Sequence, residues 1–235
     1  MAYSVNLFTL EDGLNSLLER MRTNAETLAH SPSFTNEGKL EKWDQLRGEY
    51  FNSLQTLRGQ LNAVRRGTNN LLNYARSAAV GTPPDVATPN IPAELQLARI
   101  LNRPTKWDMD TINAELNKLL GTPTAALFIE EMIARDHVEA HVIDALIEHN
   151  VPEVGEARDF QQLAQTAISN IFNPLMNDLD ELYDHGPLTP SDGATGGVEQ
   201  QYRITLADIL GSGPATIADD GSYTYNANNK EKYGA

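Results

Sequence analysis

A long series of apolar residues at heptad spacing is the feature that most constrains this chain. Between residues 43 and 78 the apolar side chains alternate at intervals of three and four, interrupted at Arg47 and Thr68. This spacing predicts one helix with a continuous apolar seam of about five heptads, roughly 60 Å long at 1.5 Å per residue. The seam consists of Trp43, Tyr50, Leu54, Leu57, Leu61, Val64, Leu71, Ala75 and Ala78.

A shorter apolar series precedes the seam. It predicts a helix that begins with Thr9 as its N-cap and ends near His30, followed by a turn over residues 31–36. Because this helix is about half as long as the second, a hairpin of the two leaves part of the seam uncovered. The rest of the chain, or another copy of it, must cover that part. The shorter series is Leu10, Leu14, Leu17, Met21 and Leu28.

Three glycines, Gly48, Gly59 and Gly67, lie within the predicted long helix. Each weakens the helix by up to about 1 kcal/mol relative to alanine. A glycine also permits the close approach of a neighbouring backbone. Tight packing and simple tolerance are both open as explanations for these three positions.

Beyond the hairpin of residues 1–80, the composition changes three times. Residues 81–92 hold four prolines without a helical period, which predicts a linker. Residues 93–185 predict an acidic bundle of short helices. Residues 186–235 are rich in Gly, Ser, Thr, Asp, Asn and Tyr, which predicts an extended arm that lies along its own body or along neighbouring subunits. The predicted fold class is all-α.

Apolar periods and helix-ending residues divide the bundle into shorter helices. The predicted helices span residues 92–101, 108–120, 124–135, 137–150 and 157–183, the last with a kink or break at Pro174. In the arm, the short apolar run of residues 202–210 is compatible with a strand or with one or two helical turns.

Composition excludes several kinds of chemistry. The 235 residues include no cysteine, which excludes disulfides, thiolate zinc sites, iron–sulfur clusters and cysteine nucleophiles. No apolar stretch approaches the roughly 18 residues of a membrane span, and the N-terminus lacks the pattern of a signal peptide. We therefore expect a cytoplasmic protein without membrane contact.

The net charge of −14 is unevenly distributed. Residues 1–80 carry nine basic and eight acidic side chains, whereas only Arg135 and Arg158 oppose fifteen carboxylates between residues 120 and 201. The acidic region should repel nucleic acid, although acidity also simply aids solubility. Four arginines of the long helix give only a weak nucleic-acid signal, and no sequence-specific nucleic acid is expected as a partner. They are Arg58, Arg65, Arg66 and Arg76.

The most suggestive chemical cluster is histidine-containing. His137 and His141 stand four residues apart, on one face of the predicted helix 137–150, where two imidazoles can bind one metal. The zinc-protease motif requires a glutamate directly after the first histidine, where this chain has Val138. No carboxylate lies three residues before either histidine, as a di-iron bundle requires. We therefore interpret the cluster as a solvated polar face.

Other catalytic motifs are missing from the sequence. It contains no Gly-rich phosphate loop, no Gly-x-Ser-x-Gly elbow and no calcium loop. Asp178, Asp180, Glu181 and Asp184 could bind a divalent cation, but they lie on one predicted helix, where their side chains do not converge. They are interpreted as a solvated face. No catalytic, metal-binding or cofactor-binding residue is assigned.

The combination of a long unequal helix pair, a helical body and a terminal arm resembles the minor head or head–tail connecting proteins of tailed bacteriophages. The resemblance implies a non-enzymatic structural subunit that is made in the cytoplasm, joins a virion, and contacts further copies and other assembly proteins. A helical-hairpin adaptor that pairs with one partner and a metal-dependent enzyme using His137 and His141 are the alternatives.

The exposed seam and the arm are the predicted contact surfaces of such a subunit. The alternative for the seam residues is ordinary core within one chain, and the alternative for the arm residues is a loop packed on its own subunit. The predicted interface residues are Tyr50, Leu54, Leu57, Leu61, Tyr202, Ile204, Leu206, Tyr223 and Tyr225.

Overall fold

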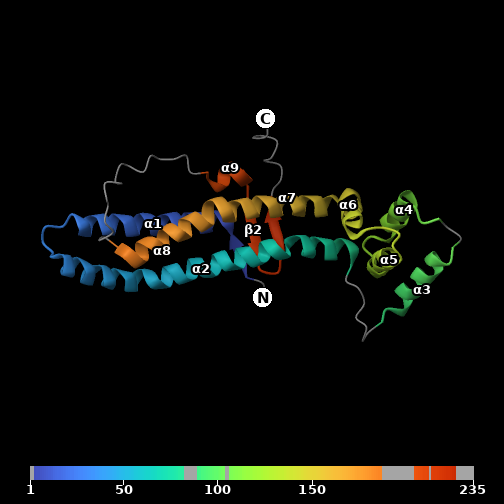
Figure 1. Cartoon of the computed structure of the whole chain (residues 1–235), viewed down its shortest axis with the longest axis horizontal. Helices are drawn as coiled ribbons and strands as arrows, with labels where there is room; N and C mark the ends of the chain where they lie inside the picture. Colours follow the sequence, from blue (N-terminus) through green and yellow to red (C-terminus); the bar gives the residue numbers. More distant parts are fainter. Residues whose placement is uncertain (1–2, 82–88, 104–105, 187–203, 212, 226–235) are drawn as a thin grey trace. The chain divides into compact units, whose positions relative to one another are not determined.

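A computed structural model describes residues 3–81, 89–103, 106–186, 204–211 and 213–225 (Figure 1). Helices dominate it, which confirms the predicted all-α class. The helices are α1 (Leu7–Ala29), α2 (Asn36–Val80), α3 (Ile91–Leu101), α4 (Met109–Leu119), α5 (Pro123–Ala134), α6 (Ala140–Asn150), α7 (Pro152–Ala167), the π-helical turn η1 (Ile168–Phe172), α8 (Asn173–His185) and α9 (Leu206–Leu210). Three short strands complete the fold: β1 (Ser4–Asn6), β2 (Ala215–Ala218) and β3 (Tyr223–Tyr225).

The chain forms two compact units. Unit 1 combines residues 1–69 with residues 161–235, and unit 2 consists of residues 70–160. This division differs from the predicted segments, which end at residues 80, 92 and 185. It differs because α2 and α7 each contribute residues to both units.

The first helix begins earlier than predicted. Asn6, not Thr9, is its N-cap: the Asn6 side-chain oxygen accepts hydrogen bonds from the backbone N–H groups of Phe8 and Thr9, at 3.0 and 3.3 Å. Thr9 therefore lies in the first helical turn, where its own N–H is one of those that need a cap.

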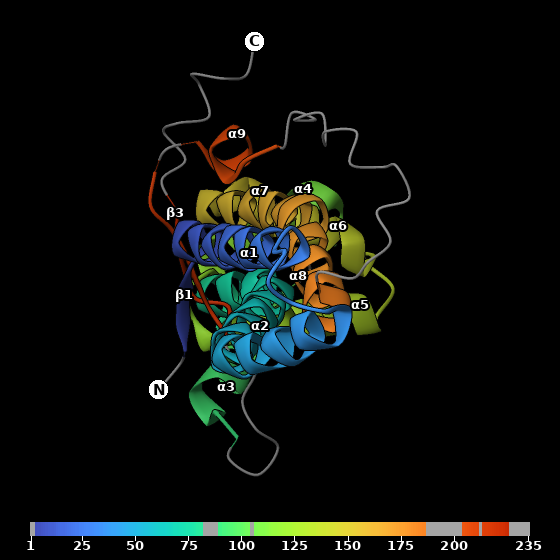
Figure 2. The same ribbon diagram turned by 90° about the vertical axis from the view of Figure 1, so that its left-hand side faces the viewer.

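In unit 1, α1 packs against α8 and also contacts α2 (Figure 2). A side chain at Gly13 of α1 would lie 2.9 Å from Leu57 of α2, so glycine permits this approach. Near the turn of the hairpin, the Asn24 side-chain amide donates to the Tyr50 hydroxyl. The Lys39 ammonium donates to the Ala29 carbonyl at 2.6 Å, which ties the end of α1 to the start of α2.

The rest of the chain covers the unit 1 part of the seam. The indole N–H of Trp43 donates to the carbonyl of Tyr183, and the same indole lies against Gly186, at the end of α8. The guanidinium of Arg47 lies 4.7 Å from the centre of the Tyr183 ring. Beyond unit 1, Leu71 is buried as well, whereas Ala75 is half-buried and Ala78 is exposed.

The glycines of the long helix divide into two kinds. A Cβ atom at Gly67 would lie 2.2 Å from the carbonyl oxygen of Ala218 in β2, so this glycine permits the strand to touch the helix backbone. Gly48 and Gly59 have nothing within 4 Å of such an atom. Tight packing therefore explains only Gly67.

The C-terminal strands join the N-terminus in an antiparallel sheet of order β1-β2-β3. Ser4 pairs with Ala218, and Thr216 pairs with Thr224 on the other side of β2. The described part of the predicted arm thus lies along its own body, which is the first of the two predicted alternatives. Of the two alternatives predicted for the apolar run, the helical one is observed: residues 206–210 form α9, whose N-cap Thr205 and Asp208 make a reciprocal capping box.

The helix continues through Pro174, but its type changes just before this residue. Proline cannot donate a backbone hydrogen bond, and a single π-helical turn, η1, precedes it. There the N–H of Asn173 donates to the carbonyl of Ile168, five residues earlier. The preceding helix α7 begins at Pro152, five residues before the predicted start.

Unit 2 is a bundle of short helices around a separate core. Trp107 and Phe128 pack with ring centres 5.7 Å apart. The N–H of Gly121 donates to the Ala79 carbonyl at 2.7 Å and so fastens the α4–α5 turn to the end of α2. The buried core consists of Val80, Ile100, Ile112, Leu116, Leu119, Ala125, Ala126, Phe128, Met132, Val138, Ile143, Ile147 and Val154. Over the described ranges, no helix is both long and apolar enough to cross a bilayer.

Candidate interaction surfaces

The predicted interface residues of the long helix are buried within their own chain. Tyr50, Leu54, Leu57 and Leu61 expose 9% or less of their surface. This burial favours the alternative that they form ordinary core. A heptad seam shows only that something covers an apolar face, and its spacing carries no information about whether the cover comes from the same chain.

The predicted interface residues of the arm have different surroundings. Leu206 is fully buried, and Tyr223 and Tyr225 are partly buried in β3. Ile204 is 52% exposed. Tyr202 lies outside the described residues.

The structure does not place the two histidines on one helix. Asp136 adopts a left-handed conformation (φ 55°) after α5, and α6 begins only at Ala140. His137 therefore belongs to the connecting turn, and the prediction that it shares a helical face with His141 is wrong. His141 instead lies 3.1 Å from the carboxylate of Glu139, and both side chains are largely exposed. Among the described residues, no group of three His, Asp or Glu side chains is arranged to hold a metal ion.

In unit 1, arginines of α1 and α2 meet the acidic residues of α8. Arg58 pairs with Asp180 at 2.6 Å, and Arg22 pairs with Asp178 at 3.1 Å. Arg47 reaches Asp184 at 3.7 Å. The carboxylates predicted to form a solvated face are thus partly neutralised by the basic side chains of the hairpin, one of which was part of the weak nucleic-acid signal.

The same neutralisation occurs inside unit 2. Arg76 pairs with Asp144, and Arg158 pairs with Glu148. Reversing the charge of these carboxylates, or of those on α8, would therefore disturb the fold as well as any contact with a basic partner.

Glu11 joins the start of α9 to α1 in unit 1. Its carboxylate accepts a hydrogen bond from the N–H of Leu206 at 3.2 Å. Burial raises the pKa of Glu11 above its ordinary value; the Leu206 hydrogen bond opposes this shift, and the negative charges of Asp12 and Asp208 add to it.

Sequence reasoning missed an exposed apolar stripe on α3. Ile91 and Leu95 expose 61% and 55% of their surface, and Ala98 is also exposed. Spacings of four and three residues place these three side chains, hereafter the α3 stripe, on one helical face. The opposite face holds the buried Ala93 and Ile100, and α3 packs on α5.

The signal for this stripe was present in the composition of residues 91–101. Eight of these eleven residues are Ile, Leu, Ala or Pro, so the helix is apolar on more than one side. A helix that is apolar all round is buried on all sides or awaits another surface.

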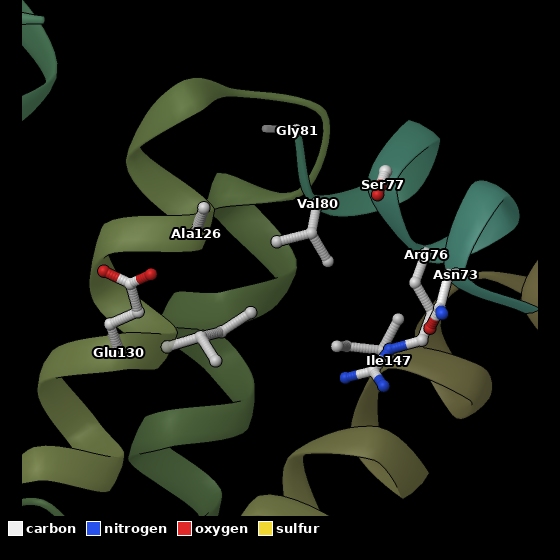
Figure 3. A pocket seen from close by; sticks show the side chains of 9 residues that line it. Asn73, Arg76, Ser77, Val80, Gly81, Ala126, Glu130 and Ile147 are labelled. Carbon is white, nitrogen blue, oxygen red and sulfur yellow. The ribbon is translucent and has the colours of Figure 1, made fainter. Parts of the chain in front are cut away.

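Unit 2 also contains an open cleft of about 290 Å³ between the end of α2 and helices α5 and α6 (Figure 3). Its floor is apolar, formed by Val80, Ala126, Ile129 and Ile147. Figure 3 shows Arg76 and Glu130 on opposite sides of this floor.

The remaining lining residues of the cleft are Asn73, Ser77 and Gly81. Both the cleft and the α3 stripe belong to unit 2, so this unit carries two candidate contact surfaces.

The sequence matches no protein-family model, no curated protein and no solved structure.

Proposed function

We propose that this protein is a non-enzymatic structural subunit of a large assembly, and that it contacts other copies of itself through unit 2. The observation that carries the proposal is the α3 stripe. Ile91 and Leu95 are the two most exposed of the large apolar side chains that the structure describes, and they lie on one face of one helix. Scattered exposed apolar residues are ordinary, whereas a contiguous row of them is typical of an interaction site.

Unit 1 supports the proposal in a different way. Its seam and most of the predicted arm contacts are used within the chain, and three of its arginines, Arg22, Arg47 and Arg58, are paired with carboxylates of α8. The proposed contact surface is therefore the α3 stripe, and not the seam that the sequence predicted. The architectural resemblance to head and head–tail connecting proteins of tailed bacteriophages makes a virion the assembly that we propose.

Point substitutions test this proposal better than truncation does. A chain that ends before residue 206 would lack β2, whose Ile217 and Ala218 touch the backbone of α2 at Gly67. Such a truncation would expose the core of unit 1 and cause association for reasons unrelated to assembly.

The test is the solution mass of the full chain by light scattering over a range of concentrations. We expect the parent protein to form oligomers, and the double variant Ile91→Glu/Leu95→Glu to remain at the chain mass of 25.9 kDa. A matched control, Leu40→Glu/Phe51→Glu, changes two exposed apolar residues of α2 in unit 1 and should associate like the parent. A parent protein that stays monomeric at every concentration would refute self-assembly through α3.

A further inference from the structure

We propose that the α3 stripe of one copy inserts into the unit 2 cleft of the next copy, so that subunits join head to tail. This inference rests on the proposed function. It adds the surface that receives the α3 stripe, the orientation of the stripe on that surface and the symmetry of the contact.

The charges beside the α3 stripe give it a polarity. At 100° per residue, Glu94 and Arg99 lie on opposite sides of the row formed by Ile91, Leu95 and Ala98. Both charged side chains are exposed, and neither forms an ion pair within the described parts of the chain. Across the helix, the stripe therefore has a negative side chain on one edge, apolar side chains in the middle and a positive side chain on the other edge.

The cleft has the matching pattern. Arg76 and Glu130 stand on opposite sides of an apolar floor (Figure 3), so that the cleft reads positive, apolar, negative. Arg76 also pairs with Asp144, which holds its guanidinium in place and offsets part of its positive charge. Docking puts Glu94 of one copy beside Arg76 of the next, and Arg99 beside Glu130. Complementary charges of this kind select the orientation of a contact more than they add affinity.

The simplest rival is a symmetric pairing of two α3 helices. If they are antiparallel, two-fold symmetry places like charges on the same side, Glu94 beside Glu94 and Arg99 beside Arg99. A parallel pair brings opposite charges together, but its apolar contact is limited to the eleven residues of each α3 helix, about 16 Å. It leaves the apolar floor of the cleft unfilled, whereas the head-to-tail contact covers the stripe and the cleft floor together.

A head-to-tail contact has a structural consequence. The stripe and the cleft are different surfaces, so each copy that donates its stripe still offers a cleft. Such a heterologous contact repeats until a ring closes, or continues as a filament. This is the kind of growth that a multi-copy structural subunit requires.

A mixing experiment distinguishes the head-to-tail contact from symmetric pairing. The stripe variant is Ile91→Glu/Leu95→Glu, and the cleft variant is Ser77→Trp, which fills the cleft from an exposed position of α2. Each variant alone should be monomeric by light scattering. Because each keeps the half that the other lacks, an equimolar mixture should form a heterodimer of twice the chain mass and nothing larger. Circular dichroism of each variant checks that it remains folded.

A charge exchange provides a second test that leaves the apolar contact intact. Arg99→Glu should weaken association roughly tenfold, and adding Glu130→Arg to the same chain should restore it. A cleft variant that assembles like the parent, a mixture that fails to pair, or a charge exchange without recovery would each overturn the head-to-tail contact. None of these results would contradict self-assembly through α3, which is refuted if the parent protein is monomeric or if the Ile91→Glu/Leu95→Glu variant assembles like the parent.

Discussion

Unit 1 and unit 2 cover their apolar surfaces in different ways. Unit 1 draws its segments from both ends of the chain, so that Ser4 pairs with Ala218 and α8 packs against α1. Unit 2 consists of the continuous residues 70–160 and is assembled from short helices. In unit 1 the seam finds its partners inside the chain. In unit 2 the α3 stripe and the cleft are left open.

The difference shows what a long apolar seam can and cannot do. A long seam offers apolar surface to several segments at once, here α1, α8 and the β2 strand. Each apolar side chain buried in this way contributes about 1.5–3 kcal/mol to stability. The helix α3 buries one face, which holds Ala93 and Ile100, and the apolar residues on its other face stay available to a second molecule.

The largest expected effect is a loss of stability in unit 2 that leaves the core of unit 1 intact. Phe128 is fully buried in unit 2, and Phe128→Ala should reduce the free energy of unfolding by about 3–5 kcal/mol through loss of contacts and a cavity. Hydrogen exchange should show the loss of protection in α4, α5 and α6, with protection retained in α1 and α8. Phe51→Ala, at an exposed position of α2, is the control and should change stability little. Equal loss of protection everywhere would mean that the two units unfold as one.

The second prediction concerns the attachment of the C-terminal sheet to unit 1. Gly67→Ala would force a methyl group against the carbonyl of Ala218, and should cost about 2 kcal/mol or more in urea denaturation. Gly59→Ala, with open space around it on the same helix, should stabilise the protein by up to about 1 kcal/mol. A Gly67→Ala variant that is as stable as the parent would show that the contact between β2 and α2 does not limit stability.

A smaller effect is expected from the ion pairs between α2 and α8. A double-mutant cycle on Arg58→Met and Asp180→Asn should give a coupling energy of about 0.2–1 kcal/mol, because both side chains are 38% exposed. Raising the salt concentration should reduce this coupling. The pair Arg58 and Glu181 serves as the control cycle and should show none.

The smallest effect is the pH dependence due to Glu11. Its pKa is raised in the folded protein, so the folded state binds the Glu11 proton more tightly than the unfolded state does. Stability from this group therefore increases as the pH falls through the folded pKa toward the ordinary value of 4.5. Glu11→Gln keeps an acceptor for the N–H of Leu206 and should remove this dependence, with unchanged or slightly higher stability at pH 7. Urea denaturation at several pH values measures it, and a steeper dependence in the variant would contradict the assignment.

Local signals in the sequence predicted many of the helix ends. The ends of α3 and α4 follow the predicted ranges closely, because Pro92, Asp108 and Gly121 act on the residues beside them. The start of α1 was misplaced because two capping residues, Asn6 and Thr9, were available, and the choice between them depends on where β1 ends. The helix predicted for residues 137–150 was placed too early, because Asp136 adopts a left-handed conformation that is rare for a residue other than glycine.

By itself, the sequence determined the helical class, the long seam and the absence of cysteine chemistry, because helical periodicity and capping depend on residues only a few positions apart. The tertiary structure alone decided which segments cover the seam, that Gly67 receives a strand from the other end of the chain, and that Arg58 meets Asp180. It also decided which apolar face of α3 remains exposed. These outcomes depend on contacts between residues far apart in the chain, and a spacing rule contains no information about such partners.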